Sequence, residues 1–246
     1  KGNWAKDLKF TLTRRDYFRY FRCFNHRGHQ FVFYSLRNIA FVFLLLIPTF
    51  AQSDQHDSDE KEPNAKLLIL GDSLSAAYGL RQEEGWVSLL QNTWRDENIP
   101  IDIVNAAVSG ETTDGGLARL PRLLTQHQPS HVLIELGGND GLQGHNVKKI
   151  RSNLVALVKI AQAADAKVFL QDMQIPTNYG KRYTNMFGES FDRVGEELNV
   201  PVIPFFLQNI ALDTSLMQRD GIHPNAEAQA LIAEFMHRQL MPLFDN

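Results

Sequence analysis

Cysteine is almost absent from this sequence, since Cys23 is the only one among 246 residues. One thiol cannot close a disulfide within the chain, and it cannot supply the several cysteines that hold structural zinc. The histidines show no H-E-x-x-H or comparable spacing, so the sequence predicts no metal ligands. Cys23 also lies in a segment that we expect to be removed, which would leave a mature chain without a thiolate nucleophile.

Positive charge is scarce beyond residue 51. The whole chain has 25 Lys and Arg against 28 Asp and Glu, and residues 1–51 hold nine of the basic and two of the acidic residues. The remainder therefore has 16 basic and 26 acidic residues, a net charge of −10. Nucleic-acid binding relies on clustered Lys and Arg at the phosphates. The sequence predicts no nucleic-acid partner.

Long apolar runs are missing as well. The run Ile39–Ile47 has no polar side chain, but it is shorter than the ~20 residues of a membrane span. Arg37 precedes it, and Thr49 and Ala51 suit cleavage after Ala51, so residues 1–51 are predicted to be a basic leader with a signal peptide. The polar, acidic residues 52–65 predict a disordered linker. We therefore expect a periplasmic or secreted protein with no stable membrane anchor after cleavage.

From Lys66 onward, short apolar segments alternate with segments of helical periodicity. The predicted strands are Lys66–Leu70, Ile101–Val104, Val132–Leu136, Lys167–Leu170 and Val202–Phe205. The predicted helices are Glu83–Asn98, Leu117–Thr125, Val147–Ala164, Tyr183–Leu198 and Ala226–Leu240. This alternation predicts one α/β domain over residues 66–246, with a parallel sheet covered by helices on both faces. The loops that follow its strands then share one edge, where open α/β sheets bind ligands.

Three short motifs fall on that edge: GDSLS at Gly71–Ser75, GGND at Gly137–Asp140 and DGIHPN at Asp220–Asn225. Together they supply the serine, histidine, aspartate and amide donor that acyl transfer by a serine nucleophile needs. Ser73 is the predicted nucleophile, because Gly71 allows a sharp turn where the first strand ends. Taken alone, a GDS sequence is more often a helix cap or a turn.

The last motif places Asp220 three residues before His223. At that spacing the carboxylate can accept a hydrogen bond from the imidazole and leave its far nitrogen for Ser73. A capped helix start with a surface histidine is the alternative. The side chain of Asn139 and the backbone N–H groups of Gly110 and Ser73 are candidate donors to an oxyanion, although each motif can also be a simple turn. Asp140 is expected to cap or brace its loop.

The motifs GDSLS, SGETT (Ser109–Thr113), GGND and DGIHPN match in order the four sequence blocks of the SGNH (GDSL) hydrolase family, and the chain resembles this family over about Lys66–Phe244. The resemblance implies a three-layer α/β/α flavodoxin-like fold with a five-stranded parallel sheet of order 2-1-3-4-5. It implies a serine esterase that acts on small-molecule acyl esters and thioesters, with no metal or organic cofactor. Separately, we expect a monomer. Ser73, Asp220 and His223 would be catalytic.

The resemblance also implies where the substrate binds. A mobile loop over Gly141–Asn146 and an apolar crevice around Ile175–Tyr179 would hold the acyl group. The predicted substrate-binding residues are Gly141, Leu142, Gln143, Gly144, His145, Ile175, Pro176 and Tyr179. Two other functions stay open, a carbohydrate O-acetylesterase with the same residues and a non-catalytic lipid-binding module of the same fold.

Overall fold

The computed structural model describes residues 65–244 of the chain. The predicted leader, residues 1–51, lies outside the described residues, as does the predicted linker apart from Ala65. That residue is the first of strand β1 (Ala65–Gly71), where it pairs with Ile101, so the folded domain begins one residue earlier than the sequence predicts.

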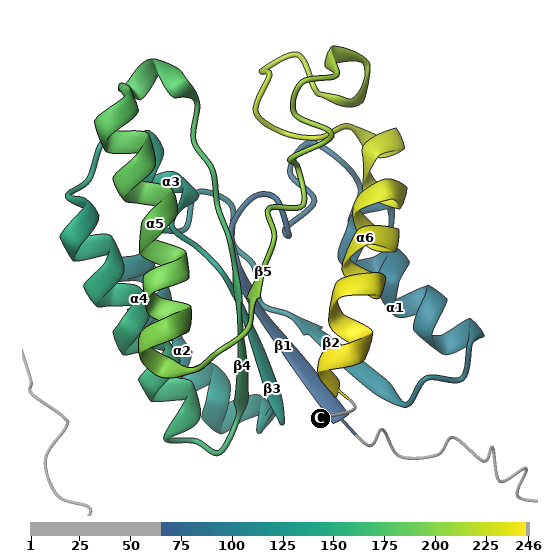
Figure 1. The fold of residues 1–246 in the computed structure, drawn as a ribbon. Helices are drawn as coiled ribbons and strands as arrows, with labels where there is room; N and C mark the ends of the chain where they lie inside the picture. The colour runs from purple at the N-terminus through teal and green to yellow at the C-terminus, as the bar shows by residue number, and fades with distance from the viewer. Residues whose placement is uncertain (1–64, 245–246) are drawn as a thin grey trace, which may run out of the picture. The chain divides into compact units, whose positions relative to one another are not determined.

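Five parallel strands form one sheet in the order β2-β1-β3-β4-β5 (Figure 1), which confirms the predicted topology. The other strands are β2 (Ile101–Asn105), β3 (His131–Glu135), β4 (Lys167–Gln171) and β5 (Val202–Ile203). The last strand is two residues shorter than predicted, because Pro204 has no N–H to donate to the sheet. Since all pairs are parallel, the carboxyl ends of the strands share one edge.

Helices cover both faces of the sheet and make three layers (Figure 1). One face carries α2 (Thr113–His127), α4 (Val147–Gln162) and α5 (Lys181–Leu198), with the short α3 (Gly138–Leu142) at its edge. The other face carries α1 (Trp86–Asp96) and α6 (Ala226–Phe244), which pack together. Short 3₁₀ turns lie at Gln82–Glu84, Thr177–Tyr179 and Thr214–Leu216.

All five predicted helices differ from their predicted bounds by up to four residues, and for two of them the local reason is clear. The predicted helix Glu83–Asn98 divides into a 3₁₀ turn and α1, because Gly85 between them has an extended backbone. Helix α2 begins four residues before the predicted Leu117. The Thr112 hydroxyl caps its start by accepting a bond from the Gly115 N–H, in spite of two glycines in the first turn.

The central strands of the sheet are apolar on both faces, because helices cover both sides. Leu67–Leu70 of β1 and Leu133 and Ile134 of β3 are fully buried, as expected for central parallel strands with helices on both sides. Trp86 and Trp94 of α1 fill one layer, and Phe187 and Phe191 of α5 fill the other. Over residues 65–244, no helix has both the length and the apolar composition that a bilayer span requires.

Candidate active site

Ser73 lies directly after β1, in a turn that we call the nucleophile turn (Gly71–Ser75). Its serine is half-buried at the carboxyl edge of the sheet. A Cβ on Gly71 would lie 2.5 Å from a carboxylate oxygen of Glu135, so the turn needs a residue without a side chain there. The Ala76 N–H donates to Asp72 O (3.0 Å), and the Tyr78 N–H donates to Ser73 O (3.2 Å). These bonds fix the serine backbone against the strand.

His223 and Asp220 reach Ser73 from the segment between β5 and α6. The distance from His223 Nε2 to Ser73 Oγ is 2.9 Å, and His223 Nδ1 lies 2.7 Å from Asp220 Oδ2. With Nδ1–H donating to the carboxylate, Nε2 is free to accept the serine proton. Asn225 begins α6 by accepting bonds from the N–H groups of Glu227 and Ala228, which places the histidine just before the helix.

The carboxylate of Asp220 is held by its own turn. Its Oδ1 accepts the backbone N–H groups of Ile222 (2.9 Å) and His223 (3.0 Å). Partial burial favours the protonated acid, but the bonds from the His223 N–H, its imidazole and the Ile222 N–H lower the pKa of Asp220 to about 2. Asp220 is therefore ionised at neutral pH and can stabilise an imidazolium at His223.

The candidate oxyanion donors come from the nucleophile turn, from α3 and from the loop after β2. Asn139 lies in α3, and its Nδ2 donates to Asp72 Oδ2 (3.1 Å) and to Glu111 O (3.0 Å). Gly110 is exposed, with φ of +81°. Within residues 65–244, the backbone N–H groups of Ser73 and Gly110 donate to no protein acceptor. The loop after β2 thus meets α3 beside the nucleophile turn, with two backbone donors unused.

Two buried carboxyl groups that the sequence reasoning did not assign lie behind Ser73. Glu135, at the end of β3, accepts bonds at Oε2 from the Asp72 N–H (3.0 Å) and the Ser75 hydroxyl (2.7 Å). Burial, with the Asp72 charge, raises the pKa of Glu135 well above its usual range, and burial raises that of Asp72 to about 6. An acid at the end of the apolar strand sequence VLIE is the signal that could have identified Glu135.

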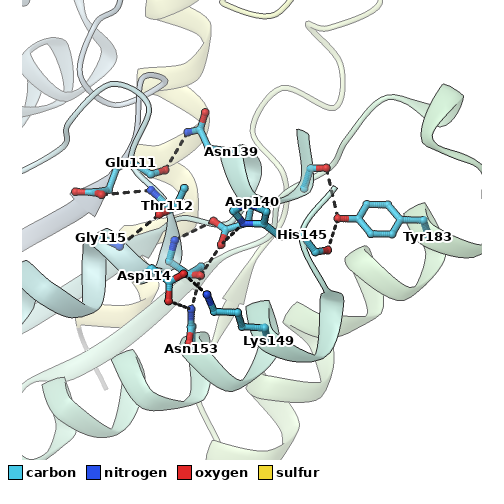
Figure 2. A network of polar contacts seen from close by, with 12 residues as sticks. Glu111, Thr112, Asp114, Gly115, Asn139, Asp140, His145, Lys149, Asn153 and Tyr183 are labelled. Carbon is cyan, nitrogen blue, oxygen red and sulfur yellow. Dashed lines mark hydrogen bonds and ion pairs between the residues drawn. The ribbon is translucent and has the colours of Figure 1, made fainter. Parts of the chain in front are cut away.

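A polar network contacts the loop 106–112, which carries Gly110, and Figure 2 shows the part of this network around Glu111, Asn139 and Asp140. Asp140 accepts the Thr113 N–H (2.8 Å) and the Thr113 hydroxyl (2.7 Å), so its carboxylate holds the start of α2. The sequence predicted that Asp140 would cap or brace its own loop, but Asp140 lies in α3 and its acceptor oxygens contact a different segment. Arg119 Nε donates to Glu111 Oε2 at 2.6 Å and Arg119 Nη1 to Ala106 O at 3.0 Å. These contacts fix the loop that carries Gly110.

A cavity of about 540 Å³ opens beside the serine and the histidine. Ser73, Asn139 and His223 lie in its wall, together with the predicted substrate-binding residues Leu142, Ile175 and Pro176. Most of the remaining wall is apolar and was not predicted, because such side chains look like ordinary core residues in sequence. It includes Met173, Phe205, Leu207, Met217 and Ile222.

The other predicted substrate-binding residues do not line this cavity, namely Gly141, Gln143, Gly144, His145 and Tyr179. The predicted loop Gly141–Asn146 also begins later than expected, because Gly141 and Leu142 belong to α3. Tyr179 donates its hydroxyl to Leu142 O (2.7 Å), and Tyr183 donates to His145 O (2.7 Å), a contact drawn in Figure 2. The two tyrosines therefore connect residues 142–145 to the 3₁₀ turn before α5 and to the first turn of α5.

Gly110 and Asp220 also lie outside the wall of the cavity. Their neighbours connect them to it, since the carbonyl of Glu111 accepts from Asn139 and the carboxylate of Asp220 contacts His223. In the part of the chain that the structure describes, no three His, Cys, Asp or Glu side chains are grouped to hold a metal ion.

A parallel α/β sheet with a serine, histidine and aspartate at its carboxyl edge is typical of hydrolases with a serine nucleophile. The model of the GDSL-like Lipase/Acylhydrolase family matches residues 69–231, and the chain belongs to this family. This result confirms the family expected from the four motifs.

Named relatives agree with this assignment. The chain is 44% identical over 180 residues to thioesterase 1/protease 1/lysophospholipase L1 of Escherichia coli (strain K12), which covers 73% of this chain and 85% of the relative. It is 43% identical over 184 residues to an arylesterase of Vibrio mimicus, covering 75% and 92%. The crystal structure of the psychrotrophic esterase EstA from Pseudoalteromonas sp., inhibited by monoethylphosphonate, has 51% identity and a TM-score of 0.73, covering 74% of this chain and 100% of that one.

Proposed function

We propose that this protein is a serine esterase that hydrolyses acyl esters and thioesters through an acyl-enzyme intermediate. The observation that carries the proposal is the continuous hydrogen-bonded line from Ser73 Oγ through His223 to Asp220. Ser73 and His223, at one end of this line, form part of the wall of a largely apolar cavity. The names of the relatives, thioesterase, lysophospholipase and arylesterase, support this class of substrate.

The reaction follows from the order of these groups. Ser73 Oγ attacks the acyl carbonyl carbon while its proton moves to His223 Nε2, and Asp220 stabilises the resulting imidazolium. Collapse of the tetrahedral intermediate breaks the bond to the alcohol or thiol, which leaves with the proton from Nε2. A water molecule then gives one proton to His223 Nε2 while its oxygen bonds to the acyl carbon. The bond from that carbon to Ser73 Oγ breaks, Ser73 takes the proton back from Nε2, and the acid is released.

The oxyanion is stabilised by the donors around the serine. The N–H groups of Ser73 and Gly110 are unused within the described chain, so they can donate without breaking a bond. Asn139 Nδ2 already donates to Asp72 and Glu111, and these bonds orient the amide. For Asn139 to donate to the oxyanion, one of those two bonds has to become shared or lengthen in the intermediate.

The shape and lining of the cavity favour an acyl chain over a sugar. Its volume of about 540 Å³ and its methionine, leucine and phenylalanine side chains suit an apolar group, because few polar side chains are available to bind hydroxyls. A carbohydrate O-acetylesterase would need polar contacts for the sugar. We therefore expect p-nitrophenyl octanoate and palmitoyl-CoA to be hydrolysed more efficiently than acetyl-xylan.

Replacement of the nucleophile tests the proposal. Ser73→Ala should lower kcat on p-nitrophenyl octanoate by roughly 10⁴-fold or more and abolish labelling by an alkyl phosphonate. Ser88→Ala is the matched control, since this hydroxyl lies in α1 and donates only to Gln82 O at 2.8 Å. Activity retained by folded Ser73→Ala protein would contradict the mechanism. A wild type that neither turns over esters nor takes the label would indicate a non-catalytic binding module.

We also propose that the protein is periplasmic or secreted. The support is the order of basic flank, apolar run Ile39–Ile47 and small residues at Thr49 and Ala51 in the sequence. N-terminal sequencing of protein recovered outside the cytoplasm should give Gln52 as its first residue. Recovery of the chain only inside the cytoplasm, with the leader intact, would contradict the proposal.

A further inference from the structure

His223 lies in a surface segment, so specific contacts have to hold its imidazole against Ser73. The flanking residues Asp220, Gly221 and Ile222 are exposed, and the bond from Nε2 to Ser73 Oγ joins residues 150 positions apart. Exposed segments with few buried contacts open at low free-energy cost. Because Ser73 and His223 are far apart in sequence, specific contacts between the segments that carry them are needed to keep Nε2 within hydrogen-bonding distance of Oγ.

The backbone hydrogen bonds within residues 216–225, the segment that carries His223, fix the shape of that segment but do not attach it to Ser73. The Gln218 N–H donates to His223 O (2.7 Å), the Gly221 N–H to Gln218 O (3.0 Å) and the Asn225 N–H to Leu216 O (2.8 Å). All of these partners lie within residues 216–225. They make a compact loop, but they do not set its position relative to the nucleophile turn.

The side chain of Gln218 makes the connection that the backbone does not. Its Nε2 donates one hydrogen to Tyr78 O (2.7 Å) and the other to Pro224 O (3.0 Å). Pro224 directly follows His223, and the Tyr78 N–H donates to Ser73 O. The Gln218 amide thus links the carbonyl of Pro224, which follows His223, to Tyr78, whose N–H is hydrogen-bonded to Ser73.

Tyr78 adds a second contact between the segments. Its ring centroid lies 4.3 Å from that of the His223 ring, with an angle of 33° between the planes. The neighbouring Gly79 has φ of +74°, and a Cβ there would lie 2.3 Å from Gln218 Oε1. A glycine at this position therefore allows Gln218 to approach the backbone.

We propose that Gln218 and Tyr78 are positioning residues that hold His223 Nε2 in line with Ser73 Oγ. The inference rests on the proposed function, because it assigns the two residues a part in the same reaction. Gln218 meets two carbonyl acceptors, so the position requires a group with two hydrogens to donate. A glutamate has the same shape, but its carboxylate would face both carbonyl oxygens.

The decisive variant is Gln218→Glu, with Gln208→Glu as the control because Gln208 is exposed in the same connection between β5 and α6. Each enzyme is titrated to completion with a p-nitrophenyl alkyl phosphonate, which counts the active serines. Turnover of p-nitrophenyl octanoate is then expressed per titrated site. We expect kcat to fall about tenfold or more in Gln218→Glu and to stay within about twofold in the control. KM should change much less than kcat, because Gln218 does not line the cavity.

A pair of tyrosine variants tests the ring contact. Tyr78→Phe keeps the ring beside His223 and should retain kcat within about twofold, whereas Tyr78→Leu should lose about fivefold or more. A purely structural role would lower the titrated fraction of each variant and leave kcat per site unchanged. If Gln218→Glu does not fold, Gln218→Met takes its place, since it removes both donors without adding charge.

The outcomes separate this inference from the proposed function. Wild-type kcat per titrated site in the Gln218 variant, or equal kcat in the two Tyr78 variants, overturns the positioning role while the esterase assignment stands. A wild-type protein that neither takes the phosphonate nor hydrolyses the ester overturns both.

Discussion

Glu135, which lies behind the nucleophile turn, is expected to tolerate glutamine and not leucine. Its side chain is fully buried, and its Oε2 accepts the Asp72 N–H and the Ser75 hydroxyl. Glutamine offers an oxygen for the same two donors, whereas leucine offers no acceptor.

The size of the effect follows from the two donors. Glu135→Leu leaves the Asp72 N–H and the Ser75 hydroxyl buried without an acceptor, and each such group costs about 1–3 kcal/mol. We expect the free energy of unfolding to fall by about 2–6 kcal/mol in Glu135→Leu and by much less in Glu135→Gln. Both are measured by urea denaturation at pH 6, with the glutamine variant as the matched control.

The same residue should make stability depend on pH. Burial and the Asp72 charge raise the pKa of folded Glu135 well above the 4.5 of an exposed glutamate. Above pH 4.5 the unfolded chain releases this proton and the folded protein keeps it, so the free energy of unfolding falls as pH rises. The slope is up to about 1.4 kcal/mol per pH unit until the folded pKa is reached. Glu135→Gln has no such proton to release.

Comparison of the two proteins isolates this effect. Asp72, whose pKa is raised by burial to about 6, gives a slope of the same sign between its exposed value of 3.8 and pH 6. Because Asp72 and Glu135 interact, the difference between wild type and Glu135→Gln measures the contribution of Glu135 together with its effect on the pKa of Asp72. Urea denaturation at pH 5, 6, 7 and 8 should show the wild type losing stability faster. Parallel stability curves for wild type and Glu135→Gln would refute the reasoning.

Three further results are expected. Asp220→Asn should lower kcat on p-nitrophenyl octanoate at least about 100-fold, because an amide lacks the charge that stabilises the imidazolium; an unchanged kcat in folded protein would contradict this role. Asp140→Ala should lower the free energy of unfolding by about 2–4 kcal/mol, since the Thr113 N–H and hydroxyl lose their acceptor. Gly141→Ala should destabilise by about 1–3 kcal/mol, because its Cβ would lie 2.8 Å from Ile175 and Phe187. The control Gly144→Ala, with open space but φ of +69°, should cost only about 1 kcal/mol in the same urea assay, and equal losses would contradict the packing argument.

Residues whose role depends on the local chain were predictable from sequence. Asp220 and His223 lie three residues apart, and the turn between them fixes their contact almost independently of the rest of the fold. The alternation of apolar runs and helical periodicity predicted a parallel sheet covered by helices, the family resemblance implied the strand order, and the structure has both. In both cases the information lies in a few neighbouring residues or in a regular pattern.

Residues whose role depends on distant partners were not predictable in the same way. Glu135 supports the nucleophile turn through Asp72, 63 positions away, and Gln218 contacts Tyr78 across 140 positions. The sequence around Gln218 has no distinctive pattern, and the one local signal for Glu135 is an acid at the end of the apolar sequence VLIE. Apolar residues in the cavity wall, such as Met173 and Phe205, have the same hydrophobic character as the core, so only their placement beside Ser73 distinguishes them.

Asp220 and Glu135, two carboxyl groups near Ser73, differ in pKa because they differ in burial and in hydrogen bonding. Asp220 is 37% exposed and accepts several N–H bonds, so its pKa of about 2 keeps it charged where the imidazolium forms. Glu135 is fully buried, and burial together with the Asp72 charge raises its pKa, which favours the uncharged acid. An uncharged Glu135 leaves less negative charge beside the nucleophile turn to oppose an oxyanion on the substrate, whereas the charged Asp220 stabilises the imidazolium of His223. The fold thus places the charged Asp220 at the surface beside His223, and places Glu135, whose pKa is raised, in the interior at the end of β3.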